Sequence, residues 1–110
     1  ELNFDAITPK FLRILKQFAP FGPQNMKPTF VTENCSTTGF IKALGEDGAH
    51  LKTNIKQLGN VFTAIGFGLG DQQELMENSK AFDIVYTIEE NEWNGIVSIQ
   101  LNLKDIRKTD

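Results

Sequence analysis

Donor side chains recur at every second position of residues 50–56, and this row is the chain's best candidate for binding chemistry. The four donors are His50, Lys52, Asn54 and Lys56. A β-strand turns alternate side chains to one face, so all four should share a surface. A strand can follow an extended backbone, and such donors fit the phosphate oxygens of single-stranded nucleic acid. The alternative, a solvated edge strand whose lysines block pairing with other strands, fits the row equally well.

Aromatic side chains provide a second set of candidates, because each can stack on a base or pack in a core. Trp93 is the only tryptophan, and a stacked base contributes about 1–3 kcal/mol. Core packing beside a turn is the more common role, and we favour it for Trp93. Most of the nine phenylalanines should be buried, with Phe40, Phe62 and Phe67 open to both roles. The candidate nucleic-acid-binding residues are Lys42, His50, Lys52, Asn54, Lys56, Phe67 and Trp93.

The run GFGLGD at 66–71 invites comparison with a phosphate-binding loop, since glycines let backbone amides approach an anion. The dinucleotide-binding fingerprint requires GxGxxG within a βαβ unit. Here the third glycine comes one residue early, the later strands are expected to be antiparallel, and Asp71 would repel a phosphate. We therefore interpret the run as a tight turn and expect no cofactor in this chain.

Catalytic and metal-binding side chains are few. His50 and Cys35 are the only histidine and cysteine, too few for a structural zinc site, which normally takes four ligands. Three glutamates crowd residues 89–92, a predicted hairpin end where charge is normally solvated rather than used as an acid–base pair. No Ser or Cys has a candidate His partner and orienting acid nearby. We expect no catalytic residue and no metal site here.

The charge balance limits the possible partners. The 110 residues carry a net charge of −3, whereas an independent nucleic-acid binder is usually basic. Residues 71–92 contain seven acids and a single base, Lys80, while the stretch 42–56 is mildly basic. No apolar run approaches the ~20 residues of a membrane span, and the single Cys35 fits a reducing compartment. We therefore expect a cytoplasmic domain without membrane attachment.

Two helices are predicted from capping residues and periodicity. The first runs from Pro9 to about residue 19, with Thr8 as its N-cap and Pro9 at the first helical position. The second is short, at about 72–79, and should be capped by Asp71, with Glu74 completing a capping box.

Five strands account for most of the remaining chain. Asn94-Gly95 between two alternating runs is a strong signal for a two-residue type I′ hairpin turn. The last strand should turn Val97, Ile99, Leu101 and Leu103 toward the core. The strands are expected at 29–44, with a bend near Gly39, and at 50–57, 61–67, 82–89 and 96–103. This order, with a helix between the third and fourth strands, predicts an OB-fold, a mainly β, five-stranded Greek-key barrel, here preceded by a helix.

Four segments together closely resemble the C-terminal part of the bacterial RecJ family, single-stranded-DNA-specific 5′→3′ exonucleases of the DHH phosphoesterase superfamily. They are APFGPQN at 19–25, HLK at 50–52, AIGFGLGD at 64–71, and the stretch 86–107 with YTIEENEWNG and SIQLNLKDIR. The resemblance covers essentially the whole chain, in order. APFGP and NEWNG are its distinctive parts.

The resemblance implies an accessory OB-fold that helps to grip single-stranded DNA, in an enzyme of DNA repair and recombination. It places residues 1–28, a helix and a proline-rich connector, at the end of a preceding DHHA1-type region, and the OB-fold at 29–110. The family's DHH ligands for Mn²⁺ or Mg²⁺ have no counterpart here. Catalysis is therefore expected in the DHH and DHHA1 domains of a longer parent chain.

Single residues carry over from the resemblance only by position. His50 and Lys52 match the family's HLK, and Asn91, Trp93 and Asn94 match its NEWNG. A second function remains open, in which the domain is a structural module that braces the nuclease core or docks single-strand-binding protein. The negative net charge and the prolines of the connector favour this alternative.

Overall fold

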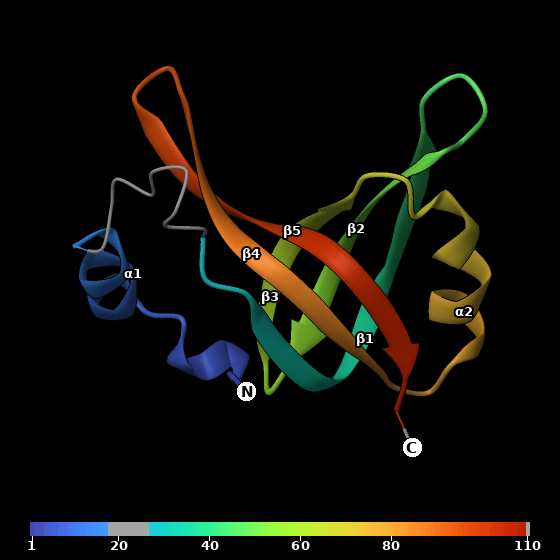
Figure 1. The fold of residues 1–110 in the computed structure, drawn as a ribbon, viewed down its shortest axis with the longest axis horizontal. Coiled ribbons are helices and arrows are strands. Elements are labelled where there is room, and N and C mark those ends of the chain that lie inside the picture. The colour runs from blue at the N-terminus through green and yellow to red at the C-terminus, as the bar shows by residue number, and fades with distance from the viewer. Residues whose placement is uncertain (18–26, 110) are drawn as a thin grey trace.

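Five strands close into one barrel in the order β1-β2-β3-β5-β4. The structure, a computed structural model, describes residues 1–17 and 27–109, so the APFGPQN segment lies outside the described residues. Among the described strands, β3 and β5 pair in parallel and the other neighbours are antiparallel. The strands are β1 (Phe30–Leu44), β2 (His50–Gln57), β3 (Asn60–Gly66), β4 (Phe82–Trp93) and β5 (Ile96–Lys108). Figure 1 shows the barrel with its long hairpins, and the predicted OB-fold is confirmed.

Strand β1 pairs with two neighbouring strands because it bends. Its first part pairs with β4 and its second part with β2, and the β1–β2 register shifts between Thr37 and Ile41. Gly39 lies inside this shift with a φ of 103°, a conformation that glycine adopts without steric cost. The predicted bend is confirmed, and it lets one strand wrap around the barrel.

Alternation along β2 supplies the barrel with core side chains. Leu51, Thr53 and Ile55 are fully buried, whereas the residues between them reach the surface. Thr53 is tolerated inside because its hydroxyl donates to the carbonyl oxygen of Phe40, 2.7 Å away. The predicted division of this strand into two faces is therefore confirmed.

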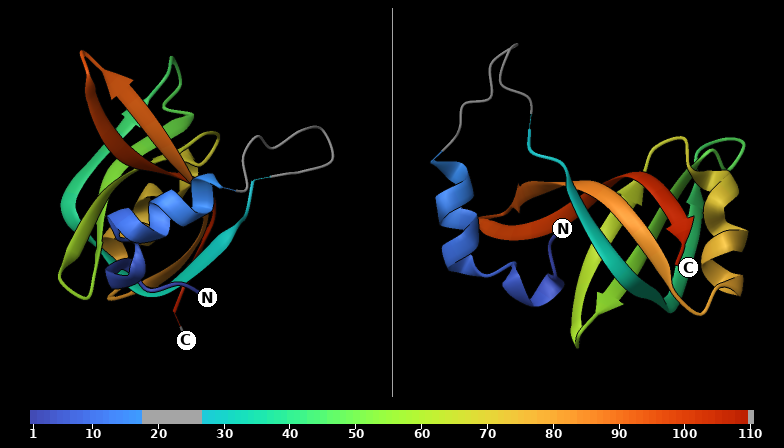
Figure 2. Two further views of the ribbon diagram at one scale, coloured as in Figure 1. Left: turned by 90° about the vertical axis from the view of Figure 1, so that its left-hand side faces the viewer. Right: turned by 60° about the horizontal axis from the view of Figure 1, so that its bottom comes forward.

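Short helices sit at opposite sides of the barrel (Figure 2). On one side lie the 3₁₀ turn η1 (Phe4–Ala6) and helix α1 (Pro9–Lys16). The Thr8 side chain accepts the N–H of Phe11, which confirms the predicted N-cap. On the other side η2 (Gly70–Gln72) leads into α2 (Gln73–Asn78), whose buried Met76 packs against the core.

The predicted capping of the second helix is wrong. Asp71 falls within η2, and α2 begins after Gln72 without any side-chain cap. A 3₁₀ turn that begins at Gly70 precedes the α-helix, so Asp71 lies inside this turn and Gln72 takes the N-cap position. Asp71 and Glu74 therefore form no capping box.

The β4–β5 hairpin is longer than predicted and projects from the barrel (Figure 1). Its turn is confirmed: Trp93 pairs with Ile96, and Asn94 and Gly95 both have positive φ. Leu101 and Leu103 are buried as expected, but Val97 lies beyond the barrel and is exposed. The strand also continues to Lys108 past a bulge.

Candidate nucleic-acid interface

The outer face of β2 carries the predicted donor row. Lys52 and Lys56 point away from the core, and Lys42 of β1 lies directly opposite Lys52. Like charges directly opposite on a sheet face repel and destabilise it. A pair of facing lysines is therefore an unfavourable arrangement by itself, and an anion between them would relieve it.

His50 has a structural role within this face. Its Nδ1 accepts the N–H of Gly68 at 2.9 Å, so the ring proton of the neutral imidazole lies on Nε2. Its ring also meets Phe67 edge-on, with centroids 5.5 Å apart. His50 thus fixes the loop after β3 and orients Phe67, leaving one donor for a ligand.

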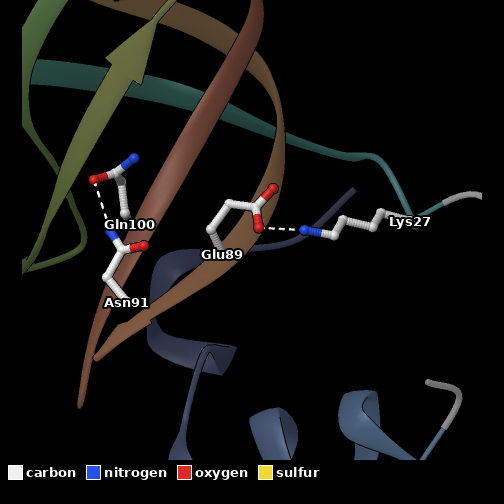
Figure 3. A network of polar contacts seen from close by, with 4 residues as sticks. All are labelled: Lys27, Glu89, Asn91 and Gln100. Carbon is white, nitrogen blue, oxygen red and sulfur yellow. Dashed lines mark hydrogen bonds and ion pairs between the residues drawn. The ribbon is translucent and has the colours of Figure 1, made fainter. Parts of the chain in front are cut away.

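A row of amide and hydroxyl groups crosses the barrel beyond the lysines. Thr63 donates to Asn54 Oδ1 at 3.1 Å, and Thr63 lies opposite Gln100 of β5. Gln100 in turn accepts a hydrogen bond from Asn91 at 2.9 Å (Figure 3). Thr63 and Gln100 were not predicted as candidates, because their proximity depends on the parallel β3–β5 pairing, for which no local sequence signal exists.

Two phenylalanines of this face are more exposed than predicted. Phe67 is 63% and Phe40 is 45% exposed, so neither belongs to the core. Phe40 shares the outward face of Lys42, two residues along β1. Phe62 instead packs edge-on against Phe4 with centroids 5.1 Å apart. The outer face therefore combines facing lysines with exposed rings.

The packing predicted for Trp93 is wrong. The side chain is 77% exposed. The reason is the length of the hairpin: it projects from the barrel (Figure 1), and the neighbouring Ile96 and Val97 at its end are exposed as well. Trp93 is available for contact with a partner.

The glutamates at the base of the hairpin form ion pairs. Glu90 contacts Lys16 of α1 at 2.8 Å, and Glu89 contacts Lys27 (Figure 3). A cavity of about 220 Å³ lies between α1 and β4 beside these pairs. Both carboxylates pair with lysines from outside the hairpin, an arrangement that suits anchoring of the hairpin rather than acid–base chemistry.

The glycine run at 66–71 forms a tight turn, as interpreted. The N–H of Gly70 is already bonded to Ala49 O at 2.9 Å, so it does not face an anion. A Cβ at Gly70 would lie 1.8 Å from Gly48 O. The glycine is required for close packing of two backbones.

Cys35 is fully buried and chemically inert in this fold. Burial raises the pKa of its thiol from 9.0 to about 12. Since the thiolate is the nucleophile, native Cys35 should react with iodoacetamide at pH 8 about 1,000-fold more slowly than a free cysteine. Mass spectrometry of timed samples measures this rate. Labelling in urea should be fast, whereas equally fast labelling of the folded chain would contradict the buried position.

The barrel and its polar face place this chain in the class of OB-fold domains. Residues 1–105 match the family described as the RecJ OB domain. The chain belongs to that family.

One exonuclease and two solved structures are similar to this chain, and the structures, each under 25% identical, bear on the fold alone. The single-stranded-DNA-specific exonuclease RecJ of Bacillus subtilis is 29% identical over 99 residues, 90% of this chain and 12% of the relative. RecJ from Thermus thermophilus, solved with Mg²⁺, is 24% identical over 93% of this chain and 15% of its own, with a TM-score of 0.67. The SSB domain of a Synechococcus sp. protein is 10% identical, covers 74% of this chain and 94% of its own, and has a TM-score of 0.50.

The metal of the Thermus relative does not fit the residues present here. That protein was solved with Mg²⁺ and with Mn²⁺. Across residues 1–17 and 27–109 of this chain, no three His, Cys, Asp or Glu side chains gather into a metal site.

Among the same residues, no helix is long and apolar enough to cross a bilayer.

Proposed function

We propose that this chain is the accessory single-stranded-DNA-binding domain of a cytoplasmic, RecJ-like 5′→3′ exonuclease of DNA repair and recombination. The single observation that carries the proposal is Lys42 facing Lys52 across β1 and β2. Two cations placed side by side favour the phosphates of a nucleic-acid backbone. The relative from Bacillus, described as specific for single-stranded DNA, makes DNA of that form the preferred ligand.

The single-stranded DNA would follow the outer face of β1 and β2. Lys42, Lys52 and Lys56 would contact phosphates, and Phe67, held by His50, would stack on a base. Asn54 contributes its amide N–H groups, because its Oδ1 is bonded to Thr63. Every base has a flat face, so stacking of this kind grips single strands without selecting a sequence.

The rest of the nuclease is assigned to other parts of a longer chain. This chain spans 12% of the Bacillus relative. Cleavage with Mn²⁺ or Mg²⁺ would belong to the DHH and DHHA1 domains of the longer chain that contains this OB-fold. Residues 1–28 would form the end of the DHHA1-type region, with the OB-fold at 29–110. The basic surfaces of those domains would complete the DNA site that a net charge of −3 leaves weak.

The double substitution Lys42→Ala/Lys52→Ala should weaken binding of a fluorescein-labelled oligothymidylate about tenfold at low salt. The two lost phosphate contacts should also reduce the slope of log K against log salt by roughly 1.4. Fluorescence anisotropy over a series of salt concentrations measures both quantities.

A matched control removes two lysines elsewhere. Lys80 and Lys108 are exposed beside α2, away from the donor row, so Lys80→Ala/Lys108→Ala makes the same change in net charge. Equal losses of DNA affinity in both variants would show that the effect comes from the overall charge and not from the lysine pair. No loss in either would remove the lysine pair as the DNA site.

A further inference from the structure

The tip of the β4–β5 hairpin is an exposed apolar cluster. Trp93, Ile96 and Val97 are 77%, 69% and 56% exposed. Trp93 and Ile96 are directly paired and share one face, while Val97 pairs with Glu92 on the other. Single exposed apolar residues are ordinary, but three at the end of one projecting hairpin suggest a contact surface.

The charges of the hairpin indicate which kind of partner it would bind. Residues 88–103 contain Glu89, Glu90 and Glu92 but no lysine or arginine. Glu89 and Glu90 are paired with lysines at the base, whereas Glu92 at the tip has no ion-pair partner among the residues that the structure describes. A phosphate backbone would be repelled here, and a basic protein surface would be attracted.

The small size of the tip indicates where that partner resides. A stable interface between separate proteins buries about 800 Å² on each side, more than three side chains supply. Domains of one chain need less, because a linker holds them at an effective concentration in the millimolar range. The relatives are long enough to hold such further domains: this chain covers 12% of one relative and 15% of another.

We propose that the hairpin tip docks onto another domain of the same longer polypeptide. Trp93 and Ile96, on one face of the tip, enter an apolar depression of that domain, and Glu92, on the opposite face beside Val97, meets a basic residue on the far wall of that depression. The hairpin then braces the barrel against the rest of the molecule. The inference shares the longer chain with the proposed function but does not depend on DNA binding by Lys42 and Lys52.

Hydroxyl-radical footprinting of the full-length protein without DNA tests the proposal by the labelling rate of Trp93. In a docked hairpin this rate should be low, and Glu92→Lys should raise it about fivefold, the shift expected from loss of one partly exposed ion pair. Leu58, 62% exposed between β2 and β3 and outside both proposed surfaces, is the internal reference. Glu74→Lys, an exposed position on α2, is the matched charge control and should leave the Trp93 rate unchanged.

Two results would overturn the proposal. The first is a Trp93 rate in the wild-type protein as high as in Glu92→Lys. The second is protection of Trp93 that arises only when oligothymidylate is added, which would assign the side chain to base stacking. Loss of DNA affinity in Lys42→Ala/Lys52→Ala is measured separately, so failure of either idea leaves the other testable.

Discussion

Replacement of Gly70 with alanine is expected to lower the free energy of unfolding by about 3 kcal/mol. A Cβ at this position would lie 1.8 Å from Gly48 O and 2.9 Å from the carbonyl carbon of Ala49. Both are backbone atoms of the β1–β2 turn, so no side chain can rotate away. Relief requires the two segments to separate, which also breaks the Gly70–Ala49 hydrogen bond.

Urea denaturation followed by far-UV circular dichroism measures the loss. Asp71→Ala is the control, because Asp71 is an exposed neighbour that caps no helix. It should change the stability by less than about 0.5 kcal/mol, whereas loss of a true N-cap costs about 1 kcal/mol. A Gly70→Ala variant as stable as Asp71→Ala would refute the close backbone approach.

Substitution of Gly70 should also affect the candidate interface. Gly70 anchors the loop after β3 to the β1–β2 turn, and the same loop presents Gly68 to His50 and Phe67 to the outer face. Separation of the two segments would therefore also displace Phe67. A mild destabilisation at Gly70 should therefore disturb the position of Phe67 at the proposed DNA site even where the barrel still folds.

Truncation of Phe4 to alanine should destabilise the barrel by about 3–5 kcal/mol. The ring is 1% exposed and meets both Phe62 and Tyr86 edge-on, at centroid distances of 5.1 and 6.3 Å. Its backbone N–H donates to Gln57 Oε1 at 2.7 Å, which holds η1 against the barrel. Alanine keeps this anchor, so the ring's volume is left as a cavity.

Chemical denaturation and differential scanning calorimetry measure this change. Phe67→Ala removes the same ring from an exposed position and should cost less than about 0.5 kcal/mol. If Phe4→Ala were equally harmless, residues 1–7 would not belong to the core of the barrel. The large expected loss means that the segment before α1 contributes to the stability of the fold.

Local patterns in the sequence determined the elements. The period of two in residues 50–57 placed Leu51, Thr53 and Ile55 inside, and Asn94-Gly95 placed the hairpin turn. Thr8 and Pro9 placed the start of α1. These features depend on backbone preferences of a few neighbouring residues, so the order of strands and the OB-fold could be predicted. The RecJ resemblance was also correct.

The tertiary structure alone decided which of these elements meet. The facing of Lys42 and Lys52 depends on a register that shifts at the bend of β1. The position of Thr63 opposite Gln100 depends on the parallel closure of the barrel. The exposure of Trp93 depends on how far the hairpin extends beyond its neighbours. A local pattern specifies the period of a strand, but its register and burial are set by distant segments, because closure and packing involve the whole chain.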